Sequence, residues 1–250
     1  MTGLLEGRTV LLTASAGSGI GFATALRCAE HGATVAISDA NESRLERAVD
    51  AFADAVGQQP IAILADVTDP GSVDALWEQA VSQLGHVDVF VNNAGRGLDR
   101  SIMETSDEDW SLVIDVSLTG AFRCLRAAFS HMLPRATGSI VNVSSVLGWR
   151  AQPRQAAYAA AKAGVMALTR VAAMEAADSG VRVNAVAPSL AMHANLSRTA
   201  PQELLDELVA KETFGRAADP SEVADVIVFL ASDMSSYMTG ECISVSSQHP

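Results

Sequence analysis

The feature that most constrains the fold is the alternation of short apolar runs with longer segments of helical periodicity along the whole chain. Several runs are continuously apolar, which is typical of parallel strands buried on both faces of a sheet. Polar cap residues stand before helical segments, as at Asp69-Pro70 and Asp219-Pro220. Strand, helix, strand repeated builds a parallel sheet with helices on both faces. The sequence therefore predicts a doubly wound α/β fold.

The apolar runs predict seven strands, at residues 9–13, 34–38, 62–66, 87–92, 139–144, 182–187 and 243–245. The helical segments lie at residues 20–31, 42–55, 73–84, 107–133, 158–179, 202–212 and 221–231. No linker, repeat or low-complexity block interrupts this order, so we expect a single domain over residues 1–250. Residues 190–216 form a long excursion after the sixth predicted strand, which is typical of a substrate-binding loop.

Composition excludes several classes of function. The 250 residues include 29 acidic and 17 basic side chains, for a net charge of −12. This balance argues against nucleic-acid or acidic-membrane partners, which need clustered Lys and Arg. No apolar stretch reaches the about 18 residues of a membrane span, and residues 1–8 lack the features of a signal peptide. Cys28, Cys124 and Cys242 are odd in number and far apart, so we expect reduced thiols, no metal site and a cytoplasmic location.

A glycine-rich segment closes the first predicted strand and opens the first helix. The residues in it that we expect to bind a dinucleotide are Ser15, Gly17, Ser18, Gly19, Ile20 and Gly21. Glycines let the backbone approach a diphosphate, and a helix N-terminus supplies N–H donors and the positive end of the helix dipole. The strict GxGxxG spacing is absent, so an ordinary strand–helix turn is the alternative.

Asp39 follows the second predicted strand, where a carboxylate can accept hydrogen bonds from the adenosine ribose and repel a 2′-phosphate. Its alternative role is to cap the next helix. Because neither Ser18 nor Ala40 is basic, we expect NAD(H) rather than NADP(H) as cofactor.

A second motif, Tyr158-Ala-Ala-Ala-Lys162, places a phenol and an ammonium one turn apart on the same helix face. An ammonium near a phenol lowers the tyrosine pKa and makes Tyr158 usable as an acid or base. The alternative is a surface lysine beside a half-buried tyrosine. Ser145 follows the fifth predicted strand, so it can meet Tyr158 at the carboxyl edge of the sheet and hydrogen-bond a substrate oxygen.

In their order and spacing these motifs resemble those of the short-chain dehydrogenase/reductase family. The resemblance implies a Rossmann-type sheet, reversible hydride transfer between a nicotinamide and an alcohol or ketone carbon, and a homotetramer or homodimer. It implies that Tyr158 exchanges the hydroxyl proton, that Ser145 stabilises the substrate oxygen, and that Lys162 binds the nicotinamide ribose. Further residues that it assigns to cofactor binding are Asp66, Val67, Asn93, Ala94, Gly95, Pro188, Ala191 and His193.

The chain departs from the family pattern at several positions. The usual Thr-Gly of the first turn falls on Ala14-Ser15, so we expect Gly17 to adopt the unusual backbone angle. The active-site Asn falls on Ser117, which would anchor a proton-relay water less firmly. The Thr that binds the carboxamide falls on His193, and a Ser-rich ending with residues 248–250 replaces the usual Val-Asp-Gly-Gly.

Apolar side chains after the catalytic and cofactor strands predict a largely apolar substrate pocket. Its candidate walls are Leu147, Trp149 and Met192, together with His193, although exposed loop residues can also pack on one another. Four arginines follow strand ends and could meet a coenzyme A phosphate or simply be scattered over the surface; they are Arg96, Arg100, Arg150 and Arg154. The loop after the fifth strand and the departures above resemble a bacterial subgroup that acts on coenzyme A thioesters of partly degraded steroid rings.

Three hypotheses follow. The first is an NAD-dependent oxidoreductase for a secondary alcohol or ketone on a bulky alicyclic or acyl-CoA substrate. The second is a 3-oxoacyl reductase acting on carrier-protein or CoA thioesters, which Asp39 disfavours if NADPH is required. The third is a nucleotide-binding scaffold without turnover, which would need none of Ser145, Tyr158 and Lys162.

Overall fold

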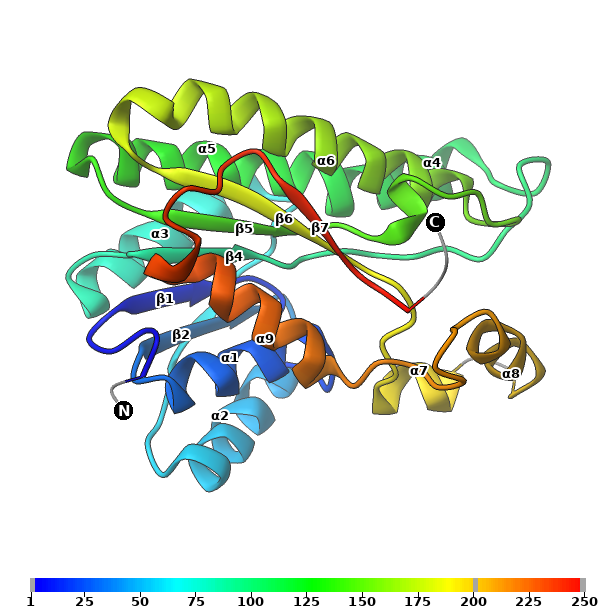
Figure 1. Ribbon diagram of the computed structural model, residues 1–250, viewed down its shortest axis with the longest axis horizontal. Helices are drawn as coiled ribbons and strands as arrows, with labels where there is room; N and C mark the ends of the chain where they lie inside the picture. Colours follow the sequence, from blue (N-terminus) through cyan, green and yellow to red (C-terminus); the bar gives the residue numbers. More distant parts are fainter. Residues whose placement is uncertain (1–2, 200–201, 248–250) are drawn as a thin grey trace.

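The computed structural model describes residues 3–199 and 202–247, and within them seven parallel strands form one sheet (Figure 1). The strands lie side by side in the order β3-β2-β1-β4-β5-β6-β7. Their bounds are β1 (Thr9–Leu12), β2 (Thr34–Asp39), β3 (Ile61–Leu64), β4 (Val89–Asn92), β5 (Ser139–Val143), β6 (Arg182–Pro188) and β7 (Cys242–Val245). The predicted doubly wound α/β fold is confirmed, and strand ends differ from the predicted ones by a few residues.

Helices cover both faces of the sheet. Their bounds are α1 (Ile20–Glu30), α2 (Glu42–Val56), α3 (Pro70–Leu84), α4 (Asp107–Ile114), α5 (Gly120–Met132), α6 (Ala156–Ala176), α7 (Ala194–Thr199), α8 (Gln202–Ala210) and α9 (Pro220–Ala231). One apolar layer joins the sheet to α1, α2 and α9, and a second joins it to α3, α5 and α6 (Figure 1). Caps start the helices where the sequence predicts them: Asp69 accepts from the Gly71 and Ser72 N–H groups, and Asp219 forms a capping box with Glu222.

Two predicted segments differ from the structure. The helix predicted over residues 107–133 is interrupted by a π-helical turn at Asp115–Thr119, which separates α4 from α5. Apolar periodicity continues across this turn, so the pattern alone does not reveal it. The predicted excursion at residues 190–216 contains α7, which was not predicted, and α8; residues 200–201 of that excursion lie outside the described residues.

The strand order reverses between β1 and β4. β1 pairs with β2 on one side and with β4 on the other, so the connections that leave β1 and β4 diverge to opposite faces of the sheet. In open α/β sheets such a point leaves a crevice at the carboxyl ends of the strands. None of the helices in the described ranges is long and apolar enough to cross a membrane.

Candidate active site

The turn after β1 reaches its unusual backbone angle at a different residue from the predicted one. Ala14 has a φ of 50°, in the left-handed region, whereas Gly17 is not among the residues with positive φ. The prediction for Gly17 is therefore wrong. The Asn93 side chain holds the turn in place, because its Nδ2 donates to the carbonyls of Thr13 at 3.1 Å and Ala14 at 2.9 Å. Asn93 thus ties the end of β1 to the end of β4.

The start of α1 is shaped for an anion. Gly19 is the N-cap and supplies no side-chain cap, so the first N–H groups of the helix remain available. A Cβ at Gly21 would lie 2.5 Å from Asn93 Nδ2 and 2.9 Å from the Ala14 carbonyl, so only glycine fits there. Gly17 and Ser18 are exposed beside this helix start. The residues present fit the diphosphate of a dinucleotide.

Ser15 has a structural position. It is fully buried, its Oγ donates to the Leu12 carbonyl at 3.2 Å, and it accepts from the Ser38 N–H at 3.1 Å. Its own N–H donates to the Ser38 carbonyl at 2.8 Å. The hydroxyl that was expected to bind cofactor is therefore committed to joining β1 to β2.

Asp39 lies at the end of β2 with only 5% of its surface exposed. Its Oδ1 accepts from the Asn41 N–H at 3.0 Å and pairs with Arg44 Nη2 at 2.9 Å. In the part of the chain that the structure describes, every hydrogen bond to this carboxylate goes to Oδ1. Oδ2 is thus left for a ribose hydroxyl. The residues adjacent to Asp39 in the sequence do not indicate Arg44, which the first turn of α2 brings back to the carboxylate.

The predicted adenine residues follow β3. Asp66 is exposed, and its Oδ1 accepts from the N–H and hydroxyl of Thr68. Val67 is 8% exposed and packs on α5, where a Cβ at Gly120 would lie 2.7 Å from its Cγ2. After β4, Ala94 is buried and Gly95 is exposed. These segments line the same carboxyl edge of the sheet as the turn after β1.

The structure brings Ser145, Tyr158 and Lys162 together. A hydrogen bond joins Ser145 to the Tyr158 phenol, and Ser145 Oγ also accepts from the Leu147 N–H at 3.2 Å. Lys162 is 2% exposed, its Nζ donates to the Val143 carbonyl at 2.7 Å, and burial lowers its pKa to about 8. The Lys162 Nζ lies 5.5 Å from the centre of the Tyr158 ring.

The electrostatic balance at Tyr158 differs from the expected one. Burial raises the pKa of the phenol, and the Ser145 hydrogen bond opposes this rise. Lys162 Nζ donates to the Val143 carbonyl, and burial disfavours its own charge. The net shift of the Tyr158 pKa is therefore upward, opposite to the expected lowering.

Ser117 lies in the π-helical turn and is fully buried. Its Oγ accepts from the Arg96 N–H at 2.9 Å and donates to the Arg96 carbonyl at 3.2 Å. The neighbouring Gly95 lies beside Lys162, since a Cβ there would be 3.1 Å from Lys162 Nζ. Ser117 thus holds the segment after β4 through both the N–H and the carbonyl of Arg96.

The candidate substrate residues come from two loops. Leu147 and Trp149 follow β5, and the Trp149 side chain is 51% exposed. Pro188 ends β6 opposite Val245, Ala191 pairs with Ala218, and Met192 is half-buried just beyond.

The His193 side chain lies beside the turn after β1, which we call the dinucleotide turn. A Cβ on Gly19 there would lie 3.7 Å from the His193 ring. Near the chain end, the Ser247 hydroxyl donates to Glu212 at 2.7 Å. Residues 248–250 lie outside the described residues.

The four predicted rim arginines differ in their partners. Arg100 pairs with Asp109 at 3.2 Å, and Arg154 pairs with Asp99 at 2.8 Å. Arg150 also has a partner. Arg96 is exposed and directly follows Gly95, whose Cβ would lie 3.1 Å from Lys162 Nζ.

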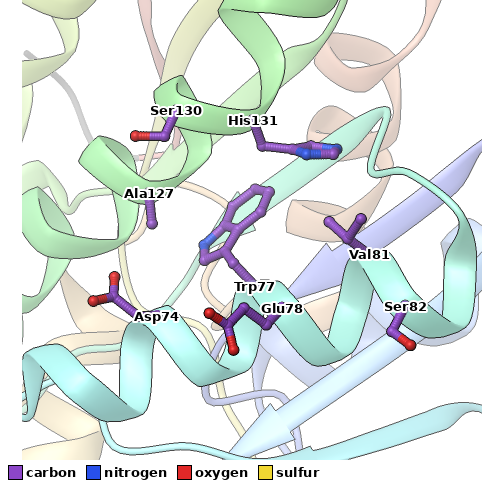
Figure 2. Close-up of a pocket in the computed structure, with 8 residues that line it drawn as sticks. All are labelled: Asp74, Trp77, Glu78, Val81, Ser82, Ala127, Ser130 and His131. Carbon is purple, nitrogen blue, oxygen red and sulfur yellow. The ribbon is translucent and has the colours of Figure 1, made fainter.

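A separate groove of about 620 Å³ lies between α3 and α5 (Figure 2). Trp77 and His131 stand at its centre, with Asp74 and Glu78 along α3. The His131 Nε2 accepts from the Val87 N–H just before β4, so this groove is at the amino end of that strand. It is therefore distinct from the carboxyl edge where the predicted site residues meet.

A family model described as enoyl-(acyl carrier protein) reductase matches residues 14–247. The chain belongs to the short-chain dehydrogenase/reductase family and is an oxidoreductase that binds a nicotinamide cofactor.

Among its relatives is the (5R,7aS)-5-hydroxy-7a-methyl-1-oxo-2,3,5,6,7,7a-hexahydro-1H-indene-carboxyl-CoA reductase of Mycobacterium tuberculosis, 54% identical over 99% of this chain and 95% of that protein. The 3-oxoacyl-(acyl-carrier-protein) reductase FabG of Thermotoga maritima is 40% identical over 96% of this chain and 97% of that protein.

Solved structures agree with this membership. A short chain dehydrogenase from Mycobacterium smegmatis superposes with a TM-score of 0.87 at 50% identity, covering 99% of this chain and 95% of the other. An NAD⁺-bound xylitol dehydrogenase gives a TM-score of 0.91 at 30% identity, with 97% and 99% covered.

Proposed function

We propose that the chain is an NAD(H)-dependent oxidoreductase that interconverts a secondary alcohol and a ketone on a bulky alicyclic coenzyme A thioester. The observation that carries this proposal is the hydrogen-bonded Ser145–Tyr158 pair beside buried Lys162, at the same sheet edge as the uncapped start of α1. In this proposal residues 1–250 form one catalytic domain, and residues 190–216 are its substrate loop.

The bound nicotinamide supplies or accepts the hydride at the carbinol carbon. Tyr158 gives its phenolic proton to the ketone oxygen in reduction and takes the hydroxyl proton in oxidation. Ser145 holds the substrate oxygen next to the phenol and, by its hydrogen bond, offsets part of the burial that disfavours the phenolate. Lys162 supplies an ammonium for the nicotinamide ribose, since the absence of a Cβ at Gly95 leaves its Nζ approachable.

The preference for NAD(H) rests on Asp39. Its buried carboxylate is held by Arg44 and Asn41 through Oδ1, which leaves Oδ2 to accept from a ribose hydroxyl and to repel a 2′-phosphate. Fluorescence titration with NADH and NADPH tests the preference, and tighter binding of NADPH would contradict it.

Two observations support a coenzyme A thioester as the substrate. One is the exposed Arg96, and the other is the Mycobacterium tuberculosis relative, whose name gives such a substrate. Ser117 hydrogen-bonds both the N–H and the carbonyl of Arg96, so the backbone from which the Arg96 guanidinium extends is fixed. A phosphate of coenzyme A is a suitable partner for it. A 3-oxoacyl thioester is the second candidate, favoured by the similarity to the Thermotoga maritima reductase.

A reduction screen tests both candidates, with steroid-derived CoA ketones, 3-oxoacyl-CoAs and simple cyclic ketones as substrates. We expect turnover to be fastest with the first group. Tyr158→Phe should abolish turnover and leave NADH binding intact, and unchanged turnover would refute the assigned role of Tyr158. Arg96→Met should raise the KM for CoA thioesters but not for free ketones, whereas Arg100→Met, which removes an arginine already paired with Asp109, should change neither.

We also propose that the chain assembles as a homotetramer or homodimer. Large apolar side chains are exposed on α5 and α6, with Phe122 at 45% and Met174 at 82%. A second group follows α9, where Met234 is 66% exposed and Tyr237 is fully exposed. Light scattering of the native chain and of Met174→Glu tests this, since a monomeric native chain would contradict it.

We place the protein in the cytoplasm on the state of its thiols. Cys28, Cys124 and Cys242 are all free, and burial raises the pKa of each thiol, to about 12, 12 and 11. Free thiols of this kind suit a reducing compartment.

A further inference from the structure

His193 lies over the dinucleotide turn although it follows a distant strand. β6 is separated from β1 by β4 and β5, and the chain returns across the carboxyl edge after Pro188. Ala191 and Ile20 pack against the same apolar layer, which holds this return in place. As a result the imidazole of His193 lies beside Gly19, the N-cap of α1, where a Cβ would be 3.7 Å from the ring.

One nitrogen of the ring is already used. The Leu196 N–H donates to His193 Nδ1 at 3.3 Å, and the Ser197 N–H donates to the His193 carbonyl at 3.1 Å. His193 therefore caps the first turn of α7. A neutral imidazole that accepts at Nδ1 carries its proton on Nε2. Burial lowers the pKa of His193, which favours this neutral form.

The remaining N–H needs an acceptor. Within residues 3–199 and 202–247 the ring makes its hydrogen bond at Nδ1, so Nε2–H is available. The ring lies over the same helix start whose N–H groups suit a diphosphate. An anion bound there would be within reach of both sets of donors.

We propose that His193 donates its Nε2–H to the diphosphate of the cofactor and thereby fastens the start of α7 over the bound dinucleotide. This inference rests on the proposed function. It differs from the role implied by the family resemblance, in which this position binds the carboxamide at the other end of the cofactor. A single side chain then joins two tasks, since Nε2 contacts the cofactor while Nδ1 caps the helix of the substrate loop.

Calorimetric titration of the full chain with ADP and with adenosine tests the proposal, because the two probes differ only in the diphosphate. His193→Phe keeps a flat ring against Gly19 but removes both nitrogens. We expect it to weaken ADP binding by about tenfold or more, the value of one hydrogen bond to a charged group, and to leave adenosine binding unchanged. His193→Gln, which retains an N–H donor and an acceptor, should recover part of the ADP affinity.

His31→Phe is the matched control. The Nδ1 of His31 also accepts a backbone N–H, from Leu4 at 3.3 Å, but it lies at the far end of α1. The His31→Phe variant should bind ADP with the affinity of the native chain. The link to α7 has its own measurement: ADP should slow tryptic cleavage after Arg198 in the native chain and not in His193→Phe.

The proposal is overturned if His193→Phe binds ADP as tightly as the native chain does. It is also overturned if the substitution weakens the binding of ADP and of adenosine equally. The second result would mean that the ring only packs on the turn. Failure of the proposed function looks different, because it would be an absence of alcohol or ketone turnover in a chain whose ADP affinity still depends on His193.

Discussion

Replacing Ala14 by glycine should stabilise the protein. The φ of 50° at Ala14 places an L-residue in the left-handed region, which costs about 1–2 kcal/mol. Glycine relieves this cost but loses about 0.5–1 kcal/mol more backbone entropy on folding than alanine does. At the midpoints of the two ranges the difference is a gain of about 0.8 kcal/mol in the free energy of unfolding.

For a chain of this size such a gain raises Tm by about 1–4 °C. The assay is thermal and urea unfolding without ligand, followed by circular dichroism. Because Asn93 continues to hold the Thr13 and Ala14 carbonyls, we expect the affinity for NAD⁺ to stay unchanged.

Ala136→Gly is the matched control. Ala136 is also an exposed alanine with a positive φ, of 53°, and it lies after α5, away from the carboxyl edge. It should gain the same stability. A gain in Ala136→Gly without one in Ala14→Gly would refute the assignment of strain to the nucleotide turn, and a loss in both would refute the reasoning altogether.

Three further predictions concern the same edge of the sheet. Lys162→Met should raise stability near neutral pH by about 3 kcal/mol, because burial lowers the lysine pKa from 10.5 to about 8 and so penalises the folded ammonium. That penalty fades as the pH rises from 8 to 10.5, so urea midpoints of the two proteins should converge there; parallel curves would contradict it. Gly21→Ala should abolish NAD⁺ binding by a clash with Asn93 Nδ2, whereas Gly71→Ala, whose Cβ would come no closer than 3.7 Å to a neighbouring atom, should bind normally in the same titration. Arg44→Ala should increase the preference for NADH over NADPH by up to about fivefold, because it removes the cation nearest the ribose; an unchanged ratio of dissociation constants would rule out this role.

The strands, and the edge of the sheet where the candidate site residues meet, were predictable because they depend on local patterns. Continuous apolar runs identify strands buried on both faces, and parallel strands bring their carboxyl ends together. Ser145, which follows β5, therefore lies close to Tyr158 and Lys162 of α6.

The sequence-based predictions are wrong where a contact between residues far apart in the sequence determines the local structure or the pKa. Ala14 adopts the left-handed angle because Asn93, from another strand, holds its carbonyl. The π-helical turn forms where Ser117 hydrogen-bonds the backbone of Arg96, which no helical periodicity reports. The pKa of Tyr158 depends on burial, which spacing along one helix does not describe.

The two fully buried thiols can report how the protein unfolds. Cys28 belongs to the apolar layer under α1 and α9, and Cys124 belongs to the layer under α5 on the opposite face of the sheet. With pKa values near 12 neither forms a thiolate in the folded chain, so an alkylating reagent reacts only after local or global opening. The two cysteines are thus built-in reporters of unfolding, one for each layer. The ratio of their labelling rates tells whether the two helix layers detach as one cooperative unit or separately.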